Sequence, residues 1–175
     1  MASAPDTLTL VENRDLRGRR DRVVAGRRAG MAIFAVVPFL ALLNLFGQRP
    51  ETSTAANAKV ALHVYAPMRA RSGNVYAARF TIDATRALKK ATLILDPGWA
   101  EGYTVNGMAP QPLSEGSSDG KLLFVLGHIP RGHHYTMFLS LQVNPTNIGR
   151  RNQRVWLYDG RRELLLVKRT ITVFP

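Results

Sequence analysis

The 175-residue sequence contains no cysteine, and its acidic residues are scarce. Without cysteine the chain can form no disulfide, no thiolate nucleophile and no cysteine-ligated metal site. Twelve Asp and Glu residues stand against twenty-four Lys and Arg, which gives a formal net charge of +12. A chain of this length has room for one ordinary domain and a short additional segment, but not for two full domains.

Sequence motifs that carry common enzyme chemistry are also missing. The chain has no Gly-x-Ser-x-Gly nucleophile elbow and no Gly-x-Gly-x-x-Gly or Walker sequence that would cradle a phosphate. Asp96 and Glu101 flank Trp99, but the order Asp96-Pro97-Gly98 gives Asp96 an ordinary turn-capping role. We therefore expect a protein that is not an enzyme and that uses no cofactor.

Three histidines near one predicted turn, His128, His133 and His134, are the candidate metal ligands. Imidazoles at such spacing can hold a transition metal if a carboxylate joins them. His133 and His134 are neighbours on a predicted strand, so their side chains should point to opposite faces of the sheet. We expect no metal at these residues, and copper or zinc carriage is the alternative.

Formal charge is absent from residues 29–48. A helix of that length spans roughly 30 Å, the hydrocarbon thickness of a bilayer. Only Asn44 and Gln48 are strongly polar, and a membrane helix tolerates a kink at Pro38. These residues predict one transmembrane helix. One alternative is twin-arginine export. The other is a cleaved signal peptide, because residues 56–58 supply a small-x-small peptidase site, although this site lies rather far from the apolar run.

Seven arginines precede this run and predict its orientation. Positive charge beside an apolar helix is retained on the cytoplasmic side of a membrane. We therefore expect a basic cytoplasmic tail at 1–28, a flexible linker at 49–58 and an extracytoplasmic domain at 59–175 on the cytoplasmic (inner) membrane. The tail can also bind anionic membrane lipid. No aromatic residue lies among its arginines to stack on bases, so no nucleic-acid partner is expected.

Beyond residue 58 apolar residues recur at every second position, which is the period of a strand. Val60, Leu62 and Val64 form one such run. Further runs occupy residues 76–82, 91–95, 121–126, 135–143, 154–158 and 164–174. Turn sequences such as Asp159-Gly160 separate them. The pattern predicts an all-β sandwich of about seven strands.

The order of the turns resembles a known family. Asp96-Pro97-Gly98, a long loop, and the segment 127–132 ahead of a strand that ends at Val143 resemble the immunoglobulin-like domains of bacterial surface proteins, in particular the CARDB-like group. The resemblance covers residues 59–174. It implies an immunoglobulin-like β-sandwich with a binding or spacer role, and it brings no catalytic residues. Residues 99–120 depart from the pattern, so their strand order stays open.

The long loop from Gly98 to Pro112 combines aromatic residues with prolines. Loops of this length in compact domains are often functional. Trp99 and Tyr103 are therefore candidate partner-binding residues. The alternative is that both side chains cover one end of the sandwich core.

A second candidate contact is the arginine-rich loop with Arg150, Arg151 and Arg154. It could bind an acidic partner, or it could be solvated loop charge. Other basic residues could join it in one positive surface: Arg161, Arg162, Lys168 and Arg169.

Together these features predict a non-enzymatic, membrane-tethered binding module whose partner is a membrane or cell-envelope protein. The alternative is an accessory subunit of a larger membrane complex, assembled through its helix with Pro38 and Asn44 at the contact. The sequence leaves the partner, the pathway and the oligomeric state open.

Overall fold

The computed structural model describes residues 8–42 and 48–175, which belong to a helical unit and a β unit. The helical unit is α1 (Leu8–Leu42), a 35-residue helix that contains Pro38. By length and composition its segment Arg22–Leu40 could cross a membrane. The predicted apolar helix is thus present, but it begins well before residue 29. The basic residues ahead of the apolar run continue the helix because Arg, Leu and Ala all favour it.

Large apolar side chains of α1 are exposed on every side of the helix. Among the described residues, seven of them are more than half exposed, at 51–84%: Val23, Met31, Ile33, Phe34, Val36, Phe39 and Leu42. At about 100° per residue these positions are spread around the helix axis. Pro38 is also exposed, whereas Asn44, the other predicted contact in this helix, lies outside the described residues.

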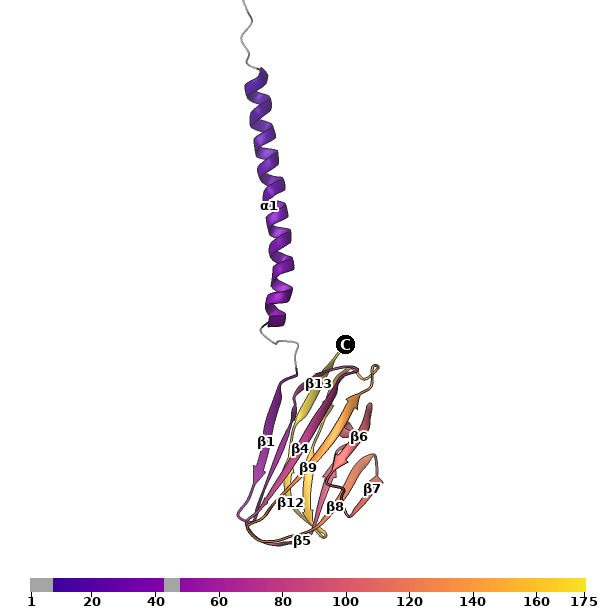
Figure 1. Cartoon of the computed structure of the whole chain (residues 1–175). Coiled ribbons are helices and arrows are strands. Elements are labelled where there is room, and N and C mark those ends of the chain that lie inside the picture. The colour runs from indigo at the N-terminus through magenta and orange to yellow at the C-terminus, as the bar shows by residue number, and fades with distance from the viewer. Residues whose placement is uncertain (1–7, 43–47) are drawn as a thin grey trace, which may run out of the picture. The chain divides into compact units, whose positions relative to one another are not determined.

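The β unit consists of thirteen strands and one short 3-10 helix, η1, within residues 48–175 (Figure 1). The elements are β1 (Pro50–Ala56), β2 (Val60–Pro67), β3 (Arg69–Arg71), β4 (Val75–Ala84), β5 (Leu88–Leu95), η1 (Pro97–Trp99), β6 (Tyr103–Ala109), β7 (Ser114–Ser118), β8 (Lys121–Ile129), β9 (His134–Val143), β10 (Gly149–Asn152), β11 (Val155–Asp159), β12 (Arg162–Val167) and β13 (Thr170–Phe174). They form a mostly β structure, as the sequence predicts.

The strands make two five-stranded sheets and one small sheet. Sheet 1 has the order β1-β2-β4-β9-β6 and sheet 2 the order β12-β11-β5-β8-β7. Sheet 3 has the order β10-β13-β3, and the β13–β3 pair is parallel whereas all other pairs are antiparallel. Figure 1 shows the long strands of the β unit lying roughly along one common axis.

One apolar core joins the inner faces of the sheets. Val60, Leu62 and Val64 of β2 are fully buried, as are Met137 and Leu139 of β9. Successive side chains of a strand point to opposite faces of the sheet, so the residues between these buried ones lie on the outer face. The predicted β-sandwich is therefore confirmed.

The expected number of about seven strands is wrong. The strands that the prediction missed are short or have no apolar alternation: β3 has three residues, and all five residues of β7 are exposed. The open strand order around residues 99–120 is also resolved. β6 pairs with β9 at the edge of sheet 1, whereas β7 pairs with β8 at the edge of sheet 2.

The predicted flexible linker at 49–58 is corrected by β1. This strand pairs with β2 from Pro50 opposite Pro67 to Ala56 opposite Ala61. The Asn57 side chain fixes the turn between them, because its oxygen accepts hydrogen bonds from the Val60 and Lys59 amides. The segment looked unstructured because β1 is an edge strand of small and hydroxyl residues with no apolar period, and a proline is tolerated at its start.

Candidate functional site

Trp99 and Tyr103, the two predicted aromatic contacts, lie in the core. Trp99 is fully buried, and its ring centroid lies 5.2 Å from that of Phe80. Tyr103 is 8% exposed and packs edge-on against Tyr76, with centroids 6.1 Å apart. Side chains this deeply buried cannot meet a partner at the surface. Their assignment as partner-binding residues is corrected, and the alternative that they cover the end of the core holds.

Arg169 is also buried, so it is not part of a positive surface. It is 5% exposed, and its Nη2 donates hydrogen bonds to the carbonyl oxygens of Ala66 and Pro67, at 3.0 and 2.8 Å. Its guanidinium lies 5.2 Å from the centre of the Trp99 ring. Burial lowers the pKa of Arg169 to about 10, so the side chain is still protonated at neutral pH. These contacts partly offset the cost of a buried charge.

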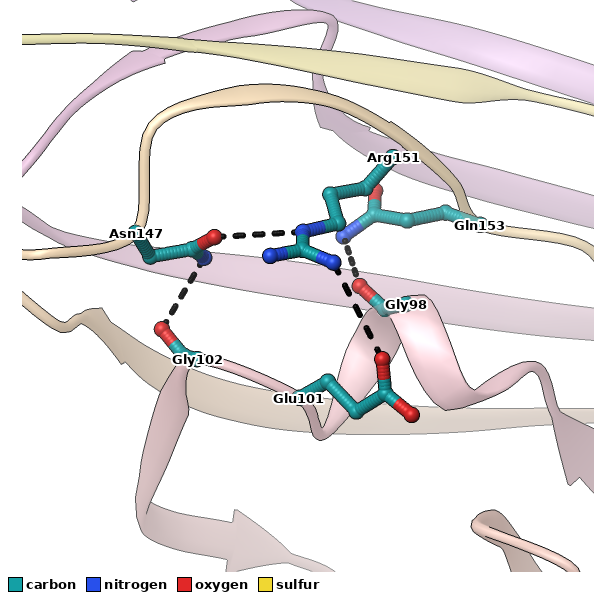
Figure 2. A network of polar contacts seen from close by, with 6 residues as sticks. All are labelled: Gly98, Glu101, Gly102, Asn147, Arg151 and Gln153. Atoms are coloured by element: carbon teal, nitrogen blue, oxygen red, sulfur yellow. Dashed lines mark hydrogen bonds and ion pairs between the residues drawn. The ribbon is translucent and has the colours of Figure 1, made fainter.

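A polar network fixes the loop between β9 and β10 to the segment that follows η1. Figure 2 shows its six residues, Gly98, Glu101, Gly102, Asn147, Arg151 and Gln153. Asn147 Nδ2 donates to the Gly102 carbonyl oxygen at 3.0 Å, and Arg151 Nε donates to Asn147 Oδ1 at 3.2 Å. Arg151 also lies 3.8 Å from a carboxylate oxygen of Glu101. The structure thus gives Arg151 contacts within the domain that hold this loop in place.

Arg150 and Arg154, the other two predicted arginine contacts, lie on different elements. Arg150 is an exposed residue of β10 and is paired with Thr172 of β13. Because Arg150 and Arg151 are neighbours on one strand, their side chains point to opposite faces. Arg154 immediately precedes β11. The structure therefore does not gather the three arginines into one cluster.

Arg154 lies at a different surface, the outer face of sheet 2. Its Nε donates a 2.7 Å hydrogen bond to Asp96 Oδ2, and this bond raises the pKa of Arg154. The guanidinium lies 5.2 Å from the centre of the Trp156 ring. Lys121 Nζ lies 5.1 Å from the same ring centre. One partly buried indole is therefore in contact with two cations, which attract the π electrons of its ring.

Trp156 belongs to an apolar row that crosses all five strands of sheet 2. Strand pairing places these residues next to one another in the order Leu166, Trp156, Ile94, Leu123 and Gly116. All but the exposed glycine are partly buried. Trp156, Ile94 and Leu123 of this row form the apolar floor of a hollow of about 280 Å³. We call this hollow, with Arg154 at its side, the Trp156 surface.

The rim of the Trp156 surface is polar. Ser118, Asp119 and Lys121 line it at one side, and Tyr158 lies on the same strand face as Trp156. An apolar floor with a few polar groups is the usual make-up of a ligand or partner site. Sequence reasoning missed this surface. The available signal was the period of two in Arg154, Trp156 and Tyr158, which places three large side chains on one strand face.

The three histidines do not converge. His128 Nδ1 lies 2.9 Å from the Leu88 carbonyl oxygen, to which it donates. His133 and His134 instead line an open hollow of about 360 Å³ together with Asp83 and Arg131. Within residues 8–42 and 48–175, no group of three or more His, Cys, Asp or Glu side chains could hold a metal ion.

No family model and no curated protein sequence matches this chain. The resemblance to the CARDB-like group therefore remains a hypothesis drawn from turn spacing.

Among solved structures, the chain is similar to a cohesin in a type I cohesin–dockerin complex from Clostridium thermocellum, with 11% identity over 61% of this chain and 90% of that one and a TM-score of 0.39. It is also similar to the third cohesin ScaC from Acetivibrio cellulolyticus, with 10% identity, coverage of 61% and 94%, and a TM-score of 0.39. A third structure is AvmM, which catalyses macrocyclization in alchivemycin A biosynthesis, with 7% identity, coverage of 74% and 90%, and a TM-score of 0.40. Likenesses this weak do not define a function for this chain.

Proposed function

We propose that this protein is a non-catalytic binding module, held at a membrane by α1, that contacts its partner through the Trp156 surface. The observation that carries the proposal is the apolar row across sheet 2, which contains the indole of Trp156 with two cations against it. Tryptophan, tyrosine and arginine are the residues that most often dominate binding energy at interfaces. The partner that fits has an apolar group for the floor and negative charge for Arg154 and Lys121.

A catalytic role has one candidate in the described part of the chain, and its setting argues against it. Thr54 Oγ1 lies 2.9 Å from His63 Nδ1, and His63 Nε2 lies 3.1 Å from Asp83 Oδ2. This order of groups is that of a hydroxyl nucleophile, a base and an orienting carboxylate. The side chains of His63 and Asp83 are 36% and 50% exposed. The three groups thus lie on an open strand face, whereas catalytic nucleophiles work in clefts that exclude water.

The membrane tether is the second part of the proposal. Its support is the segment Arg22–Leu40 of α1, together with the apolar side chains that α1 exposes on all sides. Such side chains are stable in hydrocarbon and costly in water. The seven arginines of residues 1–28 favour an N-terminus on the cytoplasmic side, with the β unit outside the cytoplasmic membrane.

The partner-binding role of the Trp156 surface can be tested by photocrosslinking in intact membranes. A photoreactive phenylalanine analogue at Leu123 of the full-length chain should form a discrete adduct. Trp156→Ala should reduce that adduct about tenfold or more, because losing an interface hot spot costs at least about 2 kcal/mol.

The matched control is Phe138→Ala, which removes a 46% exposed aromatic residue from the outer face of sheet 1. This variant should leave the adduct yield unchanged. Equal losses from both substitutions, or no loss from Trp156→Ala, would reject the Trp156 surface as the contact.

The second candidate function, assembly of a larger membrane complex through the helix, is favoured by Pro38. A proline inside a helix donates no backbone hydrogen bond, so the carbonyl of Phe34 lacks its usual partner. In a membrane a neighbouring helix could supply one. Replacing residues 29–48 with an unrelated apolar helix separates the two functions, because a simple anchor would tolerate the exchange.

A further inference from the structure

The chain enters and leaves the β unit at the same end of the sandwich. β1 starts there, and the Met68 amide donates to the Arg49 carbonyl oxygen at 3.1 Å. β13 ends there, and the Phe174 carbonyl oxygen accepts a 2.7 Å hydrogen bond from the Ser72 amide. We call this region the Arg49 end.

The Arg49 end is where the chain that comes from α1 joins the β unit. Six Cα–Cα steps separate Leu42, the last described helical residue, from Gln48. At about 3.8 Å each they span at most about 23 Å. If α1 spans a bilayer, as the proposed function holds, the Arg49 end therefore stays within this reach of the end of the span. The polar headgroup zone of one leaflet, about 5–8 Å thick, lies within this reach.

The side chains at the Arg49 end include exposed arginines. Arg69 of β3 and Arg150 of β10 pair with the same residue, Thr172, from the two sides of β13. Arg71 pairs with Phe174 at the end of β13. Arg49, Arg69, Arg71 and Arg150 are all exposed. Two acidic residues lie close by in the fold, Glu51 of β1 and Glu101, which pairs with Arg151, so the four arginines outnumber them.

Exposed apolar side chains accompany these arginines. Val75, directly after the Gly73-Asn74 turn, and Ile148, directly before β10, are each 52% exposed. The Val143 amide donates to the Asn74 carbonyl oxygen at 2.9 Å, which joins the Gly73-Asn74 turn to the end of β9. The Asn147 amide donates to the Asn144 carbonyl oxygen, also at 2.9 Å, and closes the turn that leads to Ile148. Basic residues beside exposed apolar ones are typical of surfaces that lie on anionic membranes.

We propose that the Arg49 end lies on the bilayer and binds anionic phospholipid headgroups. The four arginines contact the lipid phosphates, and Val75 and Ile148 meet the boundary of the acyl chains. Basic residues also occur at the opposite end of the sandwich, around Arg86, so charge alone does not distinguish the two ends. The two ends are distinguished by the point at which the chain enters the β unit, which is the Arg49 end. The Trp156 surface on sheet 2 then stays free for a partner.

The test uses the full-length protein in lipid nanodiscs, with an environment-sensitive dye on one introduced cysteine. The natural chain has no cysteine, so Ile148→Cys and Arg86→Cys each give a single labelled site. In discs of phosphatidylcholine with about 30% phosphatidylglycerol, the dye at position 148 should be protected from quenching by acrylamide, which is neutral, about threefold relative to discs of phosphatidylcholine alone. The dye at position 86 should be quenched equally in both.

A charge variant completes the test. Arg69→Gln, Arg71→Gln and Arg150→Gln combined should reduce the protection at position 148 to its level in phosphatidylcholine discs. Equal quenching at position 148 in both kinds of disc would overturn the proposal while the protein still eluted with the discs. Protein that eluted apart from the discs would overturn both this proposal and the membrane tether.

Discussion

Replacing Trp99 by alanine is expected to lower the free energy of unfolding by about 3–5 kcal/mol, the usual cost of truncating a buried tryptophan. The side chain is fully buried between Phe80 and the guanidinium of Arg169. Its loss leaves a cavity and uncovers one face of a buried cation. Urea denaturation of the detergent-solubilised protein, followed by far-UV circular dichroism, measures the change.

Trp156→Ala is the matched control, because it removes the only other tryptophan of the chain. Trp156 is partly buried on an outer sheet face, so its truncation should cost about 1 kcal/mol or less. If Trp99→Ala destabilised the protein no more than Trp156→Ala, the placement of Trp99 in the core would be contradicted.

Gly98→Ala is expected to be nearly as damaging, at about 3 kcal/mol, although it adds one methyl group. A Cβ at this position would collide with the backbone oxygen of Asn152. That oxygen belongs to β10, whose pairing with β13 restricts its movement. Added volume against fixed backbone costs the upper part of the usual overpacking range. The melting temperature of the purified variant reports the effect.

Gly107→Ala is the comparison for this substitution. Gly107 lies in β6, and a Cβ there would have no atom within 4 Å. Alanine in a strand loses less backbone entropy on folding than glycine, so this variant should be unchanged or slightly more stable. A similar loss of stability in both variants would show that the close approach of η1 to β10 is not what requires glycine.

Alternation of apolar residues predicted the central strands well because each has one buried and one exposed face. Val60, Leu62 and Val64 are the simplest case. The same signal does not exist for β7, which is exposed on both faces, or for β1, an edge strand of small residues. Strands of this kind are held by pairing with a neighbour. Their own sequence contains little that distinguishes them from a loop.

Burial of the predicted site residues could not be read from their types. Trp99 follows a turn and looks like an exposed loop residue, but Gly98 lets η1 pack closely, which places the indole in the core. Arg169 follows an exposed lysine in the sequence and is itself buried, because the carbonyl oxygens of β2 and the Trp99 ring receive it. Such long-range contacts are not visible in a local pattern.

The membrane topology is the central claim, and cysteine labelling tests it most directly. Single-cysteine variants Ser3→Cys and Arg86→Cys would be treated in intact cells with a maleimide that crosses the outer layers of the envelope but not the cytoplasmic membrane. Arg86→Cys should be labelled at once and Ser3→Cys only after lysis, and both proteins should stay in the membrane pellet after carbonate extraction. Labelling of Ser3→Cys in intact cells, or release of the protein into the soluble fraction, would contradict the proposed topology.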